Sequence, residues 1–263
     1  MIVDVVTYNG EQDLWDLRYN VLKDYVDEFV VVEFDRTFSG NRKSFTFDRV
    51  YPKVRYIKHH LKDYAQYRDL ALSSPNTVGA THWKLEFMQK ESVKDALALL
   101  KDNDLVFVGD VDEIWSPKIL QKHSFPVKLK LDVYTYYLNS RSSEEFWGTL
   151  VSPWYLLKDK CLNHMRTRAP KSKATYGWHF TSMGGVSALK QKLTDSYTQE
   201  SYATPQVLEN LAYNIENGRD FLGRDFTYRI DESAWPKHLK DNRERYSHLM
   251  KDGVQITGRG GSK

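Results

Sequence analysis

The segment Gly109 to Glu113 (GDVDE) has the clearest potential for chemistry in this sequence. In an extended backbone, residues i and i+2 project to the same side, so Asp110 and Asp112 are expected to converge while Val111 packs the other way. Two converging carboxylates repel each other unless a cation or shifted pKa values compensate. A hard divalent cation, held by one or two carboxylates and completed by substrate phosphate oxygens, resolves this conflict. The segment therefore predicts a metal site, with a solvated acidic turn as the alternative.

The elements that position these acids are predicted from hydrophobic periodicity. Asp104 to Gly109 (DLVFVG) is a short apolar strand, and Ser116-Pro117 is typical of a capped helix start. Similar apolar strands are expected at 2–8, 29–32 and 54–57, with amphipathic helices after residue 10 and over 83–100. Continuous apolar strands separated by helices favour a mostly parallel sheet that is covered on both faces. In such sheets ligands bind at the carboxyl ends of the strands, where the two aspartates lie.

The second half of the chain has a different pattern. Residues 128–139 alternate as a half-buried antiparallel strand does, and short aromatic strands are expected at 146–151 and 177–183. Helical patterns return near residue 188, over 206–217 and after residue 236. We expect one domain over residues 1–252, and a disordered tail over 253–263 because ITGRGGSK has no periodicity.

Composition excludes several classes of protein. The chain has 263 residues, of which 41% are hydrophobic, so it is not a disordered chain. A net charge of +3 is too balanced to predict nucleic-acid binding. No apolar stretch approaches the roughly 20 residues of a membrane helix, so we expect no transmembrane segment. The single cysteine, Cys161, excludes an internal disulfide framework and favours a reduced, cytoplasmic setting.

Several motifs recur in an order that resembles glycosyltransferase family 17, which includes the N-acetylglucosaminyltransferase that adds the bisecting residue to N-glycans. They are Asp13-Leu14-x-x-x-Arg18, Val26-Asp27-x-Phe29-Val30-Val31-Val32-Glu33, Thr37-Phe38-x-Gly40, Trp83-x-x-Glu86, the run from Asp104 to Ile114, Gly177-Trp178-His179-Phe180 and Gly184-Gly185. The chain departs from the family at Trp115, where proline is frequent, and at Ser196 to Glu200, where a Ser-His-x-Glu match is lacking. We also expect no membrane anchor of the kind that the Golgi members have.

The resemblance implies a GT-A-like α/β fold, with a smaller antiparallel portion on the acceptor side. Residues 1–115 would bind the nucleotide-sugar and residues 116–252 the acceptor. It also implies inverting transfer of a sugar, expected to be N-acetylglucosamine, from a UDP-sugar to a glycan or other hydroxyl acceptor, with Mn²⁺ or Mg²⁺ as the metal. The metal would neutralise the charge that grows on the departing diphosphate.

Candidate site residues follow from strand ends and from the motifs. The metal ligands are expected to be Asp110, Asp112 and His179, with Asp112 also counted as catalytic. The donor is expected to contact Thr7, Tyr8, Asn9, Glu33, Asp110 and Trp178. Glu145 ranks first as the general base because an aromatic run follows it, with Glu144, Asp195 and Glu200 as alternatives. The basic stretch 166–173 is interpreted as a loop, and Arg18 as the partner of Glu33 or Asp27.

Two other functions remain open at this point. A phosphatase of the haloacid dehalogenase type also places Asp-x-Asp after an apolar strand, but usually near the N-terminus with a small hydroxyl residue soon after. A carbohydrate-binding protein without catalysis would also retain the aromatic residues. The sequence does not identify the acceptor.

Overall fold

The computed structural model describes residues 1–74, 81–121, 124–195 and 203–251, without the side chains of residues 81–83, 194 and 195. The predicted tail lies outside the described residues. No helix in the described ranges is long and apolar enough to cross a membrane.

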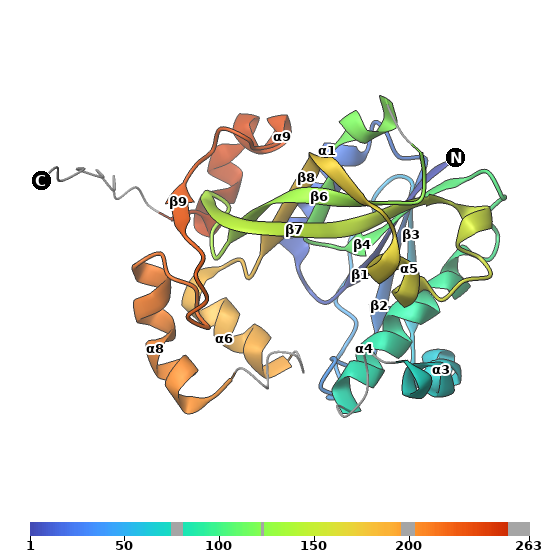
Figure 1. The fold of residues 1–263 in the computed structure, drawn as a ribbon, viewed down its shortest axis with the longest axis horizontal. Helices are drawn as coiled ribbons and strands as arrows, with labels where there is room; N and C mark the ends of the chain where they lie inside the picture. The colour runs from blue at the N-terminus through green and yellow to red at the C-terminus, as the bar shows by residue number, and fades with distance from the viewer. Residues whose placement is uncertain (75–80, 122–123, 196–202, 252–263) are drawn as a thin grey trace, which may run out of the picture.

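The described strands form one mixed sheet in the order β3-β2-β1-β4-β7-β6-β8-β5, with β9 added to β7 (Figure 1). The strands are β1 Ile2–Tyr8, β2 Glu28–Phe34, β3 Val54–His59, β4 Leu105–Asp110, β5 Glu113–Trp115, β6 Val127–Thr135, β7 Ser140–Pro153, β8 Lys171–Thr181 and β9 Tyr228–Ile230. Strands β3, β2, β1 and β4 run parallel. Strand β7 runs antiparallel to β4, β6 and β9. The predicted fold class, a mostly parallel sheet with an antiparallel portion, is confirmed.

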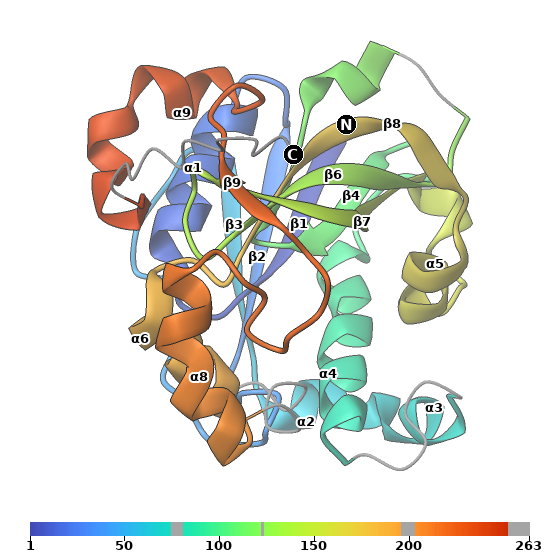
Figure 2. The ribbon, with the colours of Figure 1, turned by 60° about the vertical axis from the view of Figure 1, so that its left-hand side comes forward.

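Helices cover both faces of this sheet (Figure 2). The α-helices are α1 Gln12–Leu22, α2 Leu61–Tyr64, α3 Arg68–Ser73, α4 Thr81–Ser92, α5 Leu162–Arg168, α6 Gly185–Asp195, α8 Pro205–Glu216 and α9 Lys237–Asp241. Short 3-10 helices lie at Ala65–Tyr67, Val93–Leu97, Pro117–Gln121, Trp154–Leu156 and Arg243–Leu249. The capped helix predicted after residue 116 is thus a single 3-10 segment. The basic stretch predicted as a loop is instead the end of α5 and the start of β8.

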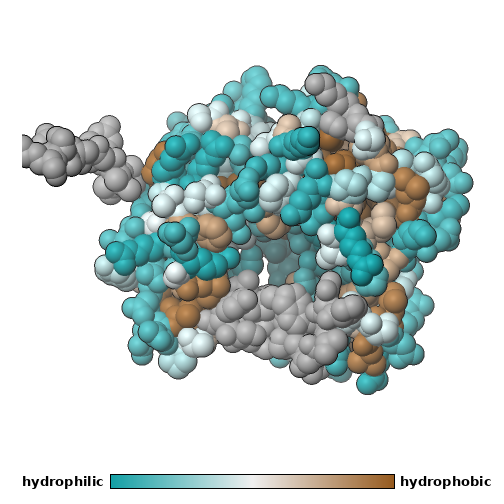
Figure 3. Space-filling model, viewed as in Figure 1, coloured by the Kyte–Doolittle hydropathy of each residue, from teal (hydrophilic) through white to brown (hydrophobic). Residues whose placement is uncertain are grey.

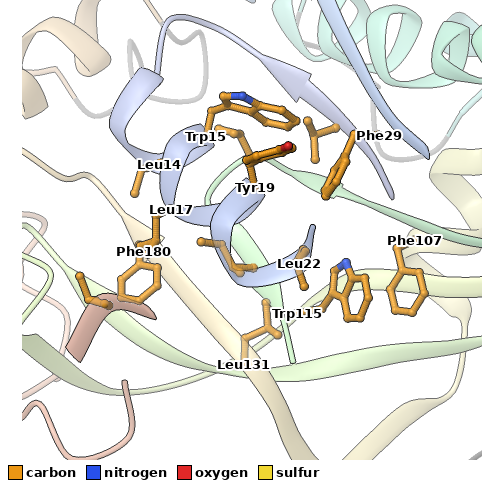
Figure 4. Packing of buried hydrophobic residues seen from close by; sticks show 14 of the residues in the cluster. Leu14, Trp15, Leu17, Tyr19, Leu22, Phe29, Phe107, Trp115, Leu131 and Phe180 are labelled. Carbon is orange, nitrogen blue, oxygen red and sulfur yellow. The ribbon is translucent and has the colours of Figure 1, made fainter. Parts of the chain in front are cut away.

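Side chains of the central strands alternate between two cores. Phe29 and Val31 of β2 pack with α1, whereas Val30 and Val32 pack on the opposite face with α4. Figure 4 shows the first core, where Trp15 of α1 lies beside Phe29. Because both faces are buried, the strand is apolar at successive positions, which is why its sequence is continuously hydrophobic.

A third, smaller core joins α6 and α8, which lie side by side in Figure 1. Leu189 and Leu193 of α6 pack against Leu211 and Ile215 of α8. The hydroxyl of Thr204 accepts a hydrogen bond from the Val207 amide at the start of α8, and Pro205 occupies the first turn. Both are typical of a helix N-terminus. This unit places α6 beside the carboxyl end of β8.

Candidate active site

A cavity of about 680 Å³ lies over the carboxyl ends of β1 and β4. Its walls come from the loop after β1, the loop after β2, α4, the turn after β4, the end of β8, and α6. The face of the molecule in Figure 3 is mainly hydrophilic and is hollowed near its centre. The position over the ends of parallel strands is the one at which open α/β sheets bind ligands.

Asp110 ends β4 and is surrounded by groups that stabilise its charge. Thr7 donates a hydrogen bond to Oδ1 at 3.1 Å, and Lys90 of α4 lies 3.2 Å from Oδ2. Arg166 of α5 lies 3.5 Å from the same oxygen. Burial alone would raise the pKa of Asp110, but Lys90 and Arg166 together hold that pKa far below its usual value. Protein cations therefore already compensate this carboxylate.

Asp112 lies in the turn between β4 and β5 and faces a different partner. Its Oδ2 is 3.5 Å from Nε2 of His179 on β8. Burial would raise the pKa of Asp112, but His179 lowers it; burial would lower the pKa of His179, but Asp112 raises it. The His179 ring stacks on Phe146 at 4.1 Å between ring centroids, and its Nδ1 is buried without a hydrogen-bond partner in the described structure.

Arg18 of α1 fixes the turn that carries the two aspartates. It is fully buried and forms an ion pair of 2.6 Å with Asp4, which is equally buried. Its Nη1 donates to the backbone carbonyls of Asp110 at 3.1 Å and Glu113 at 2.7 Å. Trp115 donates from Nε1 to Asp4 at 2.9 Å. Arg18 is thus a structural residue, as predicted, but its partner is Asp4 rather than either carboxylate expected from the sequence.

Glu113 supports the turn from within the protein. Its buried carboxylate contacts Arg166 at 3.2 and 3.3 Å and accepts a hydrogen bond from the Asp110 amide at 3.3 Å. A Cβ on Gly109 would lie 2.8 Å from this carboxylate, and one on Gly148 would lie 2.7 Å from its carbon. Both positions therefore require glycine for close packing. Glu113 holds Arg166 next to Asp110.

The donor atoms present fit a divalent cation only in combination with a substrate. Among the residues with described side chains, no group of three His, Cys, Asp and Glu is close enough to hold a metal alone. Asp112 and His179 present an oxygen and a nitrogen that face each other, whereas the Asp110 oxygens already contact Thr7 and Lys90. Mg²⁺ and Mn²⁺ are typically bound through one or two carboxylates and completed by substrate phosphates. The site fits such a cation.

Comparison with known proteins gives the family. The sequence matches the profile of glycosyltransferase family 17 over residues 1–209. The chain belongs to glycosyltransferase family 17. No curated protein sequence matches it. The bisecting type of activity stays a prediction.

Two solved structures show distant likeness to this family 17 chain. One is the galactosyltransferase LgtC in complex with donor and acceptor sugar analogs: 10% identity, TM-score 0.33, with 63% of each chain covered. The other is the Francisella tularensis 2-C-methyl-D-erythritol 4-phosphate cytidylyltransferase, with 11% identity and a TM-score of 0.37. The second match covers 74% of this chain and 100% of that one. At these scores neither structure assigns a ligand to the family 17 chain.

The first strand meets the cavity as predicted. Thr7, Tyr8 and Asn9 all contribute to its wall, and Thr7 pairs in register with Asp110 at the end of β4. Tyr8 packs edge-on against Phe47 at 5.2 Å between ring centroids. The prediction that these three residues contact the donor is consistent with their positions.

Two predicted donor contacts lie elsewhere in this glycosyltransferase. Glu33 is fully buried and accepts hydrogen bonds from Lys43, Tyr56 and the segment 46–47, so its oxygens are already used. Its partner Lys43 lines the cavity instead. Trp178 donates from Nε1 to the Ala234 carbonyl and packs against the first core. Neither residue belongs to the wall of the cavity.

Glu145 also lies outside the cavity, which corrects its predicted role as the base. It is exposed on β7 and pairs with Lys130 of β6. Phe146, the next residue, does line the cavity. Successive side chains of a strand point to opposite faces, so Phe146 and Glu145 cannot both face the cavity. Asp195 and Glu200, two alternatives for the base, have no described side chains.

The sequence analysis missed most of the cations at the site. Arg36, Lys43, Lys90 and Lys192 line the cavity. Lys90 follows Glu86 by one helical turn and contacts it at 2.6 Å. The spacing of four residues is visible in the sequence, so this ion pair could have been predicted from it. Lys192 of α6 donates a hydrogen bond to the hydroxyl of Thr181 at 3.5 Å. Its approach to the cavity depends on how α6 packs, which sequence spacing does not show.

Proposed function

We propose that this family 17 protein transfers a sugar, N-acetylglucosamine in the first instance, from a UDP-sugar to a hydroxyl acceptor with inversion. One observation carries the proposal: Asp112 and His179 lie 3.5 Å apart in the wall of a cavity at the carboxyl ends of parallel strands. Cations of the same cavity supply charge complementary to a diphosphate, and Thr7, Tyr8 and Asn9 at the end of β1 offer polar groups for a nucleoside.

Different residues of the cavity would bind the donor and stabilise the departing diphosphate. Asp112 and His179 would hold Mn²⁺ or Mg²⁺, and a cation bound there supplies charge neutralisation at the departing diphosphate. Asp110 accepts a hydrogen bond from Thr7 and pairs with Lys90. It thereby keeps the Thr7 and Lys90 side chains at the wall of the cavity. Lys192 faces the same space from α6 and would contact a phosphate oxygen. Such fixed charges stabilise developing negative charge without reorganisation.

Other predictions remain proposals at this stage. The acceptor, a glycan or another hydroxyl compound, would enter beside α6 and Phe146. The cytoplasmic location rests on the single cysteine and has no further support. Membership of a glycosyltransferase family favours sugar transfer over a phosphatase. A carbohydrate-binding protein without catalysis is the remaining alternative, and it predicts glycan binding that a chelator leaves unchanged.

Calorimetry with UDP and Mn²⁺ tests the proposal. The native protein is expected to bind UDP more tightly with Mn²⁺ than with a chelator, and Asp112→Asn and His179→Ala are expected to lose this difference. Asp132→Asn is the matched control, because Asp132 pairs with Arg141 and is not part of the cavity wall. Equal UDP binding by Asp112→Asn and the native protein, or no UDP binding by the native protein, would contradict the proposal.

The donor is identified by release of free UDP. UDP-N-acetylglucosamine and other UDP-sugars are supplied in turn with Mn²⁺, and water serves as acceptor. We expect the fastest release from UDP-N-acetylglucosamine. Faster release from another UDP-sugar would refute that choice of donor and keep the reaction class.

A further inference from the structure

Inverting sugar transfer, if the proposed function holds, needs a group that removes the proton from the acceptor hydroxyl. A carboxylate within hydrogen-bond reach of that hydroxyl commonly does this. Glu145, the residue favoured by the sequence, lies outside the cavity and pairs with Lys130. The base must therefore be sought among the acids that the fold brings to the cavity.

Six carboxylates in the described part of the chain line the cavity: Glu11, Asp13, Glu86, Asp110, Asp112 and Glu113. Three of them are held by protein cations. Lys90 lies 2.6 Å from Glu86 and 3.2 Å from Asp110. Arg166 contacts both oxygens of Glu113. An ion-paired carboxylate is a weak base, because the cation stabilises its ionised form.

Two more of the six face histidines. Asp112 faces His179 at 3.5 Å, and Asp13 lies 2.9 Å from His248. Asp112 is also the residue proposed to hold the metal. Glu11 is the sixth: it has no ion pair among the described residues, although the charge of Lys192 acts on it from a longer distance.

Glu11 is positioned as a base should be. It immediately precedes α1, in the loop between β1 and that helix, and is exposed toward the cavity. Its Oε2 accepts a hydrogen bond from the Asn9 amide at 2.7 Å, and the amide of Glu11 itself also bonds the carboxylate, which fixes its orientation. Removal of the carboxylate from bulk water and the nearby Asp112 raise the pKa of Glu11, whereas the Asn9 and Glu11 amides and Lys192 lower it, and the net shift is upward. A raised pKa suits a group that must accept a proton near neutral pH.

We propose that Glu11 is the general base of the proposed transfer. Its carboxylate accepts the proton of the acceptor hydroxyl while the acceptor oxygen forms a bond to C1 of the donor sugar. The bond between C1 and the diphosphate oxygen breaks, and its electron pair stays on the departing diphosphate. One proton moves to Glu11, one bond forms and one breaks, so the step balances without a further reactant.

The test compares Glu11→Gln with the native protein, using UDP-N-acetylglucosamine, Mn²⁺ and water as acceptor. Glutamine keeps the shape and the hydrogen bond from Asn9 but cannot take up a proton. We expect kcat for UDP release to fall by about 10²- to 10⁴-fold, the usual contribution of general acid–base catalysis. UDP affinity measured by calorimetry is expected to stay within about threefold, since the group acts on the acceptor. Glu145→Gln, on the outer face of β7, is the control and should retain native kcat.

Sodium azide separates a base from a structural role. Azide attacks as an anion and needs no proton removal, so it should restore UDP release by Glu11→Gln and yield a glycosyl azide. The acidic limb of the native pH–rate profile should also disappear in this variant. Retained kcat in Glu11→Gln would overturn the inference. A parallel loss of UDP affinity would also overturn it, as would a loss of kcat that azide does not restore.

The same assay covers the two acids without described side chains. Loss of kcat with azide rescue in Asp195→Asn or Glu200→Gln, and not in Glu11→Gln, would reassign the base. Absence of UDP release from the native protein with every UDP-sugar would instead refute the proposed function, and this role with it. The two failures are therefore distinguishable.

Discussion

Replacement of Arg18 by methionine tests whether the buried ion pair positions the site. Arg18 and Asp4 have no exposed side-chain surface, and Arg18 also donates to the carbonyls of Asp110 and Glu113. Methionine preserves much of the apolar stem but removes every donor. The change therefore leaves Asp4 as a buried carboxylate without its cation and releases the turn that carries Asp110.

The magnitude follows from the contacts that remain. Removing one partner of a buried ion pair costs about 3–5 kcal/mol, because the other charge stays buried without compensation. Trp115 still donates one hydrogen bond to Asp4, which favours the lower half of that range. We expect Arg18→Met to lower the free energy of unfolding by about 3–4 kcal/mol. This is a large share of the roughly 5–15 kcal/mol typical of a domain.

Urea unfolding followed by circular dichroism measures this loss. Arg55→Met is the matched control, since Arg55 also pairs with a carboxylate, Glu28, and donates to the Ala96 carbonyl, but is 35% exposed. A partly exposed pair of this kind contributes about 1 kcal/mol or less. A loss below about 1 kcal/mol in Arg18→Met, no greater than that of the control, would refute the reasoning.

A double variant separates stability from positioning. Asp4→Leu combined with Arg18→Met removes both buried charges, so it should recover most of the lost stability. The carbonyls of Asp110 and Glu113 would still lack their donor, so UDP affinity should stay reduced. Full recovery of both properties would show that Arg18 has no role in holding the turn.

Two further predictions concern groups that support the site from behind. In Gly148→Ala the new Cβ would lie 2.7 Å from the Glu113 carboxyl carbon. We therefore expect the free energy of unfolding, measured in urea, to fall by about 1–3 kcal/mol and UDP binding to weaken. An unchanged unfolding midpoint would contradict this. Glu91 is buried and accepts hydrogen bonds from the amides of Leu162 and Asn163 at the start of α5. Burial opposes ionisation, but Lys94 and these amides lower the pKa of Glu91 below its usual 4.5. Its stabilising effect is therefore present above about pH 4.5 and is lost as the pH falls through the lower folded-state pKa. Glu91→Gln should be less stable at pH 7 and should lose less stability on acidification, and parallel stability–pH curves for the two proteins would disprove the assignment.

Local patterns in the sequence predicted most of the fold. Strands at 2–8, 28–34 and 105–110 are apolar at successive positions because both of their faces are buried, and that pattern needs no knowledge of the partner strands. The acids after β4 could likewise be placed at the ligand-binding edge, because they follow such a strand directly. Short elements such as α2, α3, α5 and β9 were not predicted, since a few residues carry too little periodicity.

The sequence by itself thus determined the apolar strands of the first half, the longer helices and the edge at which Asp110 and Asp112 lie. Tertiary structure decided which groups neutralise these acids, because Lys90 and Arg166 come from helices whose packing on the sheet sets their reach. It also decided that Glu145 faces away from the cavity, since the pairing register of β7 fixes which side each residue occupies. Glu11 became a candidate only when the fold placed its carboxylate in the wall of the same cavity as Asp112, with no ion pair among the described residues. Charge compensation depends on distances through space, which spacing along the chain does not record.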